Sequence, residues 1–329
     1  MSREHDVREV GMREAFAATA TDLLDEDLSV TLVYAEISGQ YLNRAERAHP
    51  ERVVNVGIRE QLLVNVGAGM ALTGLRPIVH TIGSFLVERG FEQIKLGFGH
   101  QDVGGVLVAI GGSYDVSAGG RTHQAPGDVA LIDTLPGWTV HVPGHPDEVE
   151  PLLRSAVAGE ERVYLRLGEQ RNAVPYPTTG RLVRVREGGA ATVVAVGPML
   201  DRVLEAVAGL DVGVLYASTV RPFDAAGLSA ALARRDVMPD VVIVEPYLAG
   251  TSTRLVAEAM VDVPHRVLGL GVPRERELRR YGTPDQHAAA HGLDPVGLRR
   301  SISRFLETPR IGAGGSAAAA GGVSGEGVA

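Results

Sequence analysis

The sequence predicts an α/β protein with two domains, each built on a mainly parallel sheet that is covered by helices. Short apolar runs rich in β-branched residues alternate with longer helical patterns along most of the chain. Continuous apolar strands of this kind are typical of parallel sheets buried on both faces. The 329 residues are enough for two domains, and a cluster of Pro, Thr and Gly at 175–180 marks the boundary between them.

The first expected domain, residues 1–178, is a series of strands separated by helical stretches. A helix made of small apolar residues is expected over 62–72, directly after the second strand. The expected strands are 30–35, 53–56, 77–80, 106–110, 138–142 and 163–167.

The second expected domain, residues 185–308, repeats the same alternation. Its expected strands are 192–196, 212–216, 241–244 and 267–270, and its expected helices are 199–208, 225–235 and 252–261. Residues 309–329 are almost entirely Gly, Ala and Ser. Such a segment buries too little apolar surface to offset the entropy lost on ordering, so we expect a flexible tail.

The composition narrows the classes of function. The formal net charge is −8 without a basic cluster, which argues against nucleic acid or an anionic membrane as partner. The chain has no cysteine, so disulfides, thiolate metal sites and cysteine nucleophiles are excluded. The charged N-terminus lacks the apolar core of a secretory signal, and no apolar run approaches the roughly 20 residues that span a bilayer. We therefore expect a cytoplasmic protein.

Glu60 is the first candidate for chemistry. It lies in the run 55–61, where an expected strand ends, Gly57 turns the chain and a helix begins. In an open α/β sheet, the carboxyl ends of the strands face a ligand crevice. Apolar neighbours would bury the carboxyl group and raise its pKa, which suits proton exchange at neutral pH. The alternative is an ordinary acidic residue that the helix macrodipole favours at this position.

Aromatic side chains are the second candidate. Phe85 and Phe91 lie in the run 84–93 and are two of only 6 phenylalanines in the chain. A planar heteroaromatic ligand needs an aromatic face on which to stack. The alternative is that both rings pack in the core.

A Gly-rich loop over 111–124 is the third candidate, because it directly follows the expected strand 106–110. Long loops after strands commonly lie against a ligand. His123 is the acid–base group of this loop. The alternative is a structural histidine that only makes hydrogen bonds to its neighbours.

Taken together, four short motifs resemble the pyrimidine-binding and C-terminal domains of transketolase, over about residues 12–304. They occur in the family's order and at compatible spacing. They are 55–61 (NVGIREQ), 89–93 (RGFEQ), 120–124 (GRTHQ) and 218–224 (STVRPFD).

The resemblance implies binding of thiamine diphosphate and a role for each matching residue. Glu60 matches the glutamate that hydrogen-bonds N1′ of the aminopyrimidine ring and activates the cofactor. His123 matches a histidine near the 4′-amino group and the reacting carbonyl. Phe85 and Phe91 are candidates for the wall on which the pyrimidine ring stacks. Further cofactor contacts are expected from Glu36, Arg89 and Gln93.

The substrate pocket implied by the resemblance departs from the sugar-phosphate pattern. Arg13 takes the place of an arginine that helps bind an acceptor phosphate, and His123 would contact the substrate as well. Where the family usually has a Ser-Arg pair, this chain has Gly168 and Glu169, and a carboxylate would repel phosphate. We therefore add Glu169, Arg121 and Arg166 to the expected substrate-binding residues.

The chain lacks the Gly-Asp-Gly motif with which the family holds the cofactor diphosphate and a divalent cation. The resemblance therefore implies a partner, an N-terminal transketolase-type subunit that carries this motif and mainly holds Mg²⁺ or Ca²⁺. No metal ligand is assigned to this chain. An α2β2 heterotetramer is the expected closed assembly.

The leading hypothesis is thus a subunit of a heteromeric transketolase-like enzyme that transfers a two-carbon ketol unit from a ketose to an aldehyde or another acceptor. One alternative is a subunit similar to 1-deoxyxylulose-phosphate synthase or to an E1-type decarboxylase β subunit, acting on a 2-oxo acid or feeding an acyl carrier. Another is a non-catalytic paralogue that has kept the fold.

Overall fold

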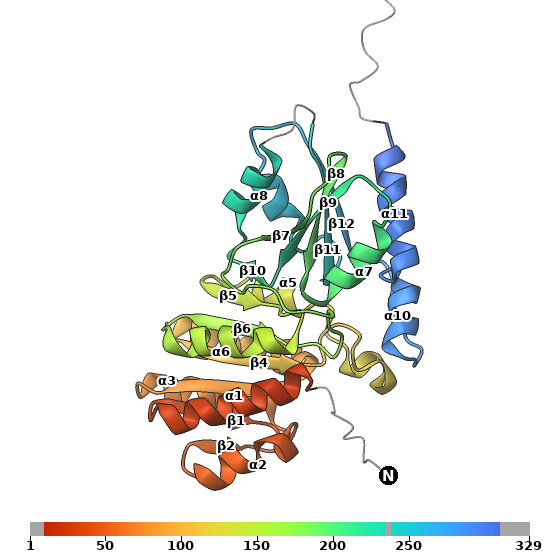
Figure 1. The fold of residues 1–329 in the computed structure, drawn as a ribbon. Helices are drawn as coiled ribbons and strands as arrows, with labels where there is room; N and C mark the ends of the chain where they lie inside the picture. Colours follow the sequence, from red (N-terminus) through yellow and green to blue (C-terminus); the bar gives the residue numbers. More distant parts are fainter. Residues whose placement is uncertain (1–9, 234–237, 310–329) are drawn as a thin grey trace, which may run out of the picture.

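The computed structural model describes residues 10–233 and 238–309, and these residues form two sheets covered by helices (Figure 1). The first sheet has seven strands in the order β10-β5-β6-β4-β3-β1-β2, and the second has five in the order β12-β11-β8-β9-β7. All pairings are parallel except β10 with β5 and β7 with β9. The expected fold class is therefore confirmed.

The first sheet contains all six strands expected in residues 1–178, each within two residues of its expected ends. Its strands are β1 (Val30–Tyr34), β2 (Val53–Asn55), β3 (Arg76–Ile82), β4 (Gly105–Ile110), β5 (Trp138–His141), β6 (Arg162–Arg166) and β10 (Thr219–Arg221). Alternate residues of each strand face opposite sides of the sheet, so the apolar runs fill two cores at once.

Helices cover both faces of this sheet. On one face, α1 (Met12–Glu26), α2 (Gly39–Ala48) and α6 (Val149–Ala158) pack on strand residues such as Leu32 and Ile78. On the other face, α3 (Glu60–Leu72), η1 (Ser84–Arg89), α4 (Phe91–Gln93), η2 (Ile94–His100) and α5 (Asp128–Ile132) pack on residues such as Val33 and Val79. The segments η1 and η2 are π-helical, a geometry that occurs often at functional sites.

The second sheet consists of β7 (Val183–Arg186), β8 (Ala191–Val196), β9 (Val212–Ala217), β11 (Asp240–Leu248) and β12 (Arg266–Val272). One face carries α7 (Leu200–Ala206), α10 (Pro284–His291) and α11 (Pro295–Glu307), and the other carries α8 (Ala225–Leu232) and α9 (Thr253–Glu258). The expected tail, residues 309–329, lies outside the described residues except for residue 309. No helix in the described parts of the chain is long and apolar enough to cross a membrane.

The two sheets share a junction that the sequence did not indicate. Strand β10 comes from the second half of the chain but pairs antiparallel with β5, at the edge of the first sheet. The motif 218–224 therefore contains a strand that crosses to the other domain. Buried polar contacts accompany the crossing: Tyr216 donates to Glu148 at 2.5 Å, and Arg221 contacts both Asp133 and Ser252.

Glu245, on β11 beside this junction, gives the fold a pH dependence. Its side chain is fully buried, one oxygen accepts from the backbone of Ser252 at 3.1 Å, and the other has no hydrogen-bond partner. Burial raises the pKa of this carboxyl from 4.5 to about 7. A raised pKa in the folded state means that its stabilising effect is complete below about pH 4.5 and is lost as the pH rises through 7.

We therefore expect Glu245→Gln to flatten the decline of stability between pH 5 and 8. The variant should be more stable than the wild type at pH 8 by about 1–3 kcal/mol, and nearly equal to it at pH 5. Denaturant unfolding at both pH values measures the difference. Glu258→Gln, an exposed carboxylate, is the control. An unchanged pH slope in the Glu245 variant would contradict this assignment.

Candidate active site

Most of the expected site residues lie in the segments that follow the strands of the first sheet. Six of its strands run parallel, so their carboxyl ends meet at the same edge. The chain passes from β1 outward to β2 and then returns to β3 on the other side of β1. Ligands of open α/β sheets bind at such a switch point, outside the carboxyl ends of the strands.

The backbone is strained at this edge. Glu36 and Ser38, which follow β1, and Ser113, which follows β4, have φ values of 57°, 69° and 52°. Non-glycine residues rarely adopt this left-handed conformation, and such strain concentrates at functional sites. Asn55 ties two of the loops together, because its side-chain oxygen accepts from the backbone of Glu36 at 3.2 Å and of Gly57 at 2.9 Å.

Glu60, Arg89 and Phe85 form one contiguous group. Glu60 is the first residue of α3, and its side chain is only 2% exposed. Arg89 donates to its carboxylate at 2.6 Å, and the Arg89 guanidinium lies 4.3 Å from the centre of the Phe85 ring. Phe85 and Arg89 are four residues apart on η1, so they share one side of that helical turn. A buried carboxylate thus sits beside an aromatic face.

His123 joins the same group from the Gly-rich loop. Its ring centre lies 5.2 Å from that of Phe85, with the planes at 68°. Its Nδ1 is 3.0 Å from the hydroxyl of Thr122, which fixes the ring and directs Nε2 to the opposite side. A side chain on Gly119 would meet the His123 ring at 3.1 Å, so the glycine leaves the space that the ring occupies. The structure therefore links Glu60 to His123 through Arg89 and Phe85.

A buried ion pair holds this loop to the sheet. Arg166, at the end of β6, is paired with Asp128 at 2.7 Å, and both side chains are almost completely buried. Arg166 also donates to Ser113 at 2.7 Å, while Tyr164 donates to Asp128 at 2.8 Å. Arg166 is one of the residues predicted to bind substrate, and in the structure its guanidinium is enclosed by these partners.

A second polar group lies at the switch point, and sequence reasoning found only one of its members. Arg13 on α1 donates to Ser38 at 2.8 Å, and Ser38 contacts Nε2 of His80 at 2.7 Å. Nδ1 of His80 lies 2.9 Å from the carbonyl of Val108. Full burial lowers the pKa of His80 to about 3, so this histidine is neutral and positions Ser38 and Arg13. The signal was the polar residue His80 inside an apolar strand.

Glu169 follows β6 near Arg13. Desolvation and the charge of Asp115 raise the pKa of its carboxyl, and the charge of Arg13 opposes that shift. Asp115, itself buried, accepts from the backbone of Glu169 at 2.9 Å and from the side chain of Gln170 at 2.7 Å. Arg13 therefore lies close enough to Glu169 for its charge to influence that carboxyl group.

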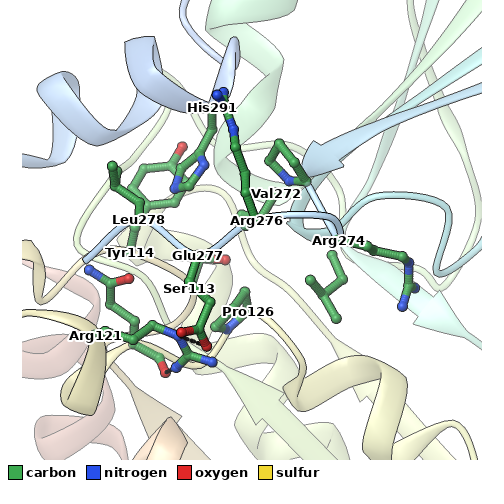
Figure 2. Close-up of a pocket in the computed structure, with 13 residues that line it drawn as sticks. Ser113, Tyr114, Arg121, Pro126, Val272, Arg274, Arg276, Glu277, Leu278 and His291 are labelled. Carbon is green, nitrogen blue, oxygen red and sulfur yellow. Dashed lines mark hydrogen bonds and ion pairs between the residues drawn. The ribbon is translucent and has the colours of Figure 1, made fainter. Parts of the chain in front are cut away.

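The remaining expected residues are less central. Phe91 and Gln93 are half-buried on α4, which directly follows η1, and in the described parts of the chain neither makes a ring contact or hydrogen bond with the Glu60 group. Arg121 points to another cavity and pairs with Glu277 at 3.2 Å (Figure 2). Within residues 10–233 and 238–309 no group of three or more His, Asp or Glu is arranged to hold a metal ion.

Comparison with known proteins identifies the family. Residues 8–174 match the model of the transketolase pyrimidine-binding domain, which is about half of the chain. The chain therefore belongs to the family of proteins that contain this domain. It is 51% identical over 296 residues to a 33.6 kDa protein of the fasciation locus of Rhodococcoides fascians, covering 90% of this chain and 95% of the relative.

Two further relatives have named activities. A 1-deoxy-D-xylulose-5-phosphate synthase from Synechococcus is 30% identical over 315 residues, and the chain spans only about half (48%) of that protein. One of the subunits of an apulose-4-phosphate transketolase from Phocaeicola vulgatus is 25% identical over 312 residues, and 98% of it is covered. Each of these two relatives matches about nine-tenths of this chain.

A solved structure described as a split-gene transketolase, an inactive beta4 tetramer, is also similar. Its TM-score is 0.77 at 26% identity, covering 91% of this chain and 99% of that one. The chain thus corresponds in extent to one separately encoded part of a transketolase rather than to a whole one.

The buried ion pair makes a testable prediction about the scaffold of the site. Asp128→Asn leaves the charge of Arg166 buried without its partner, which should lower the free energy of unfolding by about 3–5 kcal/mol. The pair of Asp102 with Arg162 is the control: the carboxylate of Asp102 is 88% exposed, so Asp102→Asn should cost less than about 1 kcal/mol. Chemical denaturation measures both variants. Equal effects would show that the loop does not depend on the ion pair.

Proposed function

We propose, from the membership of the chain in the transketolase family, that it is one subunit of a thiamine-diphosphate-dependent enzyme that transfers a two-carbon ketol unit from a ketose to an aldehyde or another acceptor. The observation that carries the proposal is the group of Glu60, Phe85 and His123 at the carboxyl edge of the sheet. A buried carboxylate, an aromatic face and an imidazole are the groups that this chemistry needs.

The residues of this group fit the pyrimidine half of the cofactor. Phe85 offers an aromatic face, and Glu60 is a buried carboxylate on the first turn of a helix. Thiamine diphosphate supplies a nucleophilic carbon that cleaves the bond next to a carbonyl group. Glu60 would hold a proton at the ring nitrogen N1′, and its surroundings exclude water from that contact. Glu36, Arg89 and Gln93 are further candidates for cofactor contacts.

His123 would act on the substrate. The contact of Nδ1 with Thr122 leaves Nε2 to donate to, or accept a proton from, an oxygen of the reacting carbonyl. Such a donor stabilises developing negative charge on that oxygen. His123 packs against Phe85, so the proposed proton-transfer group and the proposed stacking face are positioned together.

Arg13 and Glu169 would set the choice of substrate. Arg13 is held through Ser38 and the neutral His80, which gives its guanidinium a defined position. The nearby carboxylate of Glu169 disfavours a fully charged phosphate. The pair instead suits a substrate with hydroxyl groups, which can donate to the carboxylate and accept from the guanidinium.

A partner subunit would complete the site. Ile58 and Leu62 flank Glu60 in the sequence, yet they are 71% and 44% exposed. Leu72, at the far end of α3, and Leu96 on η2 are 57% and 47% exposed. Exposed large apolar residues beside a site are a feature of surfaces that bind another protein. We therefore propose that an N-terminal transketolase-type subunit covers this surface, supplies the diphosphate site and holds Mg²⁺ or Ca²⁺, in an α2β2 assembly.

A second function has its own support. The chain is 30% identical to 1-deoxy-D-xylulose-5-phosphate synthases, slightly more than to the apulose-4-phosphate transketolase. A 2-oxo acid such as pyruvate is therefore the alternative donor. Incubating the assembled complex with pyruvate or with a ketose separates the two, because only a 2-oxo acid releases carbon dioxide.

The first test of the proposed function is Glu60→Gln. The variant keeps the shape of the side chain but cannot exchange a proton as a carboxyl group, so turnover of the assembled complex should fall at least about a hundredfold. Steady-state kinetics with the partner measures the effect. Glu51→Gln, an exposed carboxylate just before β2 at the opposite edge of the sheet, is the matched control and should keep the turnover of the wild type. Turnover like that of the wild type in the Glu60 variant would refute the assignment.

The second test concerns the partner surface. Leu62→Glu places a charge in the proposed interface and should weaken assembly with the partner at least about tenfold, because burying an unpaired charge is costly. Leu28→Glu is the matched control, since Leu28 is 82% exposed and lies before β1, at the opposite edge of the sheet. Analytical ultracentrifugation of the mixtures measures assembly. If both variants assembled equally well, the interface would lie elsewhere.

A further inference from the structure

A cavity of about 140 Å³ lies behind the loop that carries His123 (Figure 2). One wall belongs to this loop and includes Ser113, Tyr114 and Gln124, and the facing wall belongs to the second domain. That second wall is the segment 272–278 after β12, together with His291 of α10. The cavity therefore lies between the two halves of the chain and is separate from the Glu60 group.

The charged side chains around this cavity are mostly arginines. Arg121, Arg274 and Arg276 line it against a single carboxylate, Glu277. Glu277 lies 3.2 Å from Arg121 and 3.6 Å from Arg279, so its charge is already balanced. In a protein with a net charge of −8, a local excess of positive charge favours the binding of a negatively charged ligand.

The arginines are held in place and still have donors to offer. Arg276 donates through one terminal nitrogen to the carbonyl of Ala290 at 3.0 Å, and Arg121 donates to the carbonyl of Gln124 at 3.1 Å. A guanidinium group has five N–H donors, so these contacts orient each group without using all of its donors. Figure 2 shows Arg276 running along the cavity toward His291, with Arg121 and Glu277 at its other end.

The other lining residues suit the organic part of a small ligand. Pro126, Leu248, Val272 and Leu278 provide apolar surface. Behind the wall, Gln124 lies 3.3 Å from Nδ1 of the buried His287, whose other ring nitrogen has no hydrogen-bond partner. Burial lowers the pKa of His291 to about 4, so this ring is neutral near pH 7 and can accept or donate one hydrogen bond.

We propose that this cavity is a binding site for the oxyanion group of a small organic phosphate or carboxylate, with Arg276 and Arg121 as its main ligands. Guanidinium groups bind such oxyanions through paired hydrogen bonds. The site goes beyond the proposed ketol transfer, because none of the groups assigned to that reaction lines the cavity except Arg121, which pairs with Glu277 of the cavity wall.

Occupation of this site would act on the loop of His123. Arg121 is adjacent to Thr122 in that loop, and Tyr281 of the facing segment lies against Gly120, where an added side chain would meet the ring at 2.7 Å. An anion bound to Arg121 and Arg276 would join the loop to the segment 272–278. The bound ligand would thereby fix the position of His123.

Titration calorimetry of the full chain with inorganic phosphate and with acetate tests the site. Arg276→Gln should weaken binding of the preferred anion about tenfold, the effect of losing one charge-assisted contact. Glu277→Gln should instead strengthen binding, because it removes a repelling charge and releases Arg121. The matched controls Arg280→Gln and Glu275→Gln change the same charges on exposed neighbours outside the cavity and should have little effect.

Each result decides the matter. Tighter binding of phosphate identifies a phosphoryl ligand and tighter binding of acetate a carboxylate, and both support the site. Absence of binding up to about 50 mM of either anion overturns it. The proposal is also overturned if Arg13→Gln abolishes binding while Arg276→Gln binds like the wild type, because the anion then binds at the strand ends. Since this measurement needs neither partner nor cofactor, its failure leaves the proposed function standing.

Discussion

The arrangement of the site depends on one buried ion pair. Arg166 and Asp128 are nearly inaccessible to water, and each would be costly to bury alone. Together they connect β6, α5 and, through Ser113, the start of the Gly-rich loop. Arg166 also lies 5.4 Å from the ring centre of Tyr247 on β11, so the second domain packs against the same guanidinium. A side chain on Gly112 would overlap Arg166, which explains the glycine there.

From this anchor the site divides into a rigid part and an open part. The rigid part is the network of Arg13, Ser38 and the neutral His80, which is built inside the sheet and needs no other chain. The open part is the surface around Glu60, where Ile58 and Leu62 face the solvent. The strained residues after β1 and β4 belong to the rigid part, because surrounding hydrogen bonds hold them there.

Much of the fold could be predicted, because strands buried on both faces must be continuously apolar. The strand β10 could not be predicted, because three residues are too few to show a periodic pattern. Its pairing with β5 depends on how the two domains pack against each other. Among the site residues, Glu60 and His123 could be proposed from the sequence, because both follow the end of an expected strand and lie in motifs that resemble transketolase. The burial of Arg166 could not be predicted, because the direction of a side chain at a strand end depends on its tertiary partner, here Asp128. Ser38 was missed because nothing in the sequence marks a left-handed serine.

The pair of Glu60 and Arg89 is unequal, and this bears on how the site would be filled. Glu60 is 2% exposed, whereas Arg89 is 41% exposed and lies over the face of Phe85. Because Glu60 is buried, turning Arg89 aside would leave the charge of its carboxylate without a partner unless another donor replaced the guanidinium. An aromatic ring that stacked on this face of Phe85 would replace the guanidinium. Arg89 pairs with the carboxylate of Glu60 and covers the face of Phe85 in the structure, so a ring bound on that face would have to supply its own donor to Glu60.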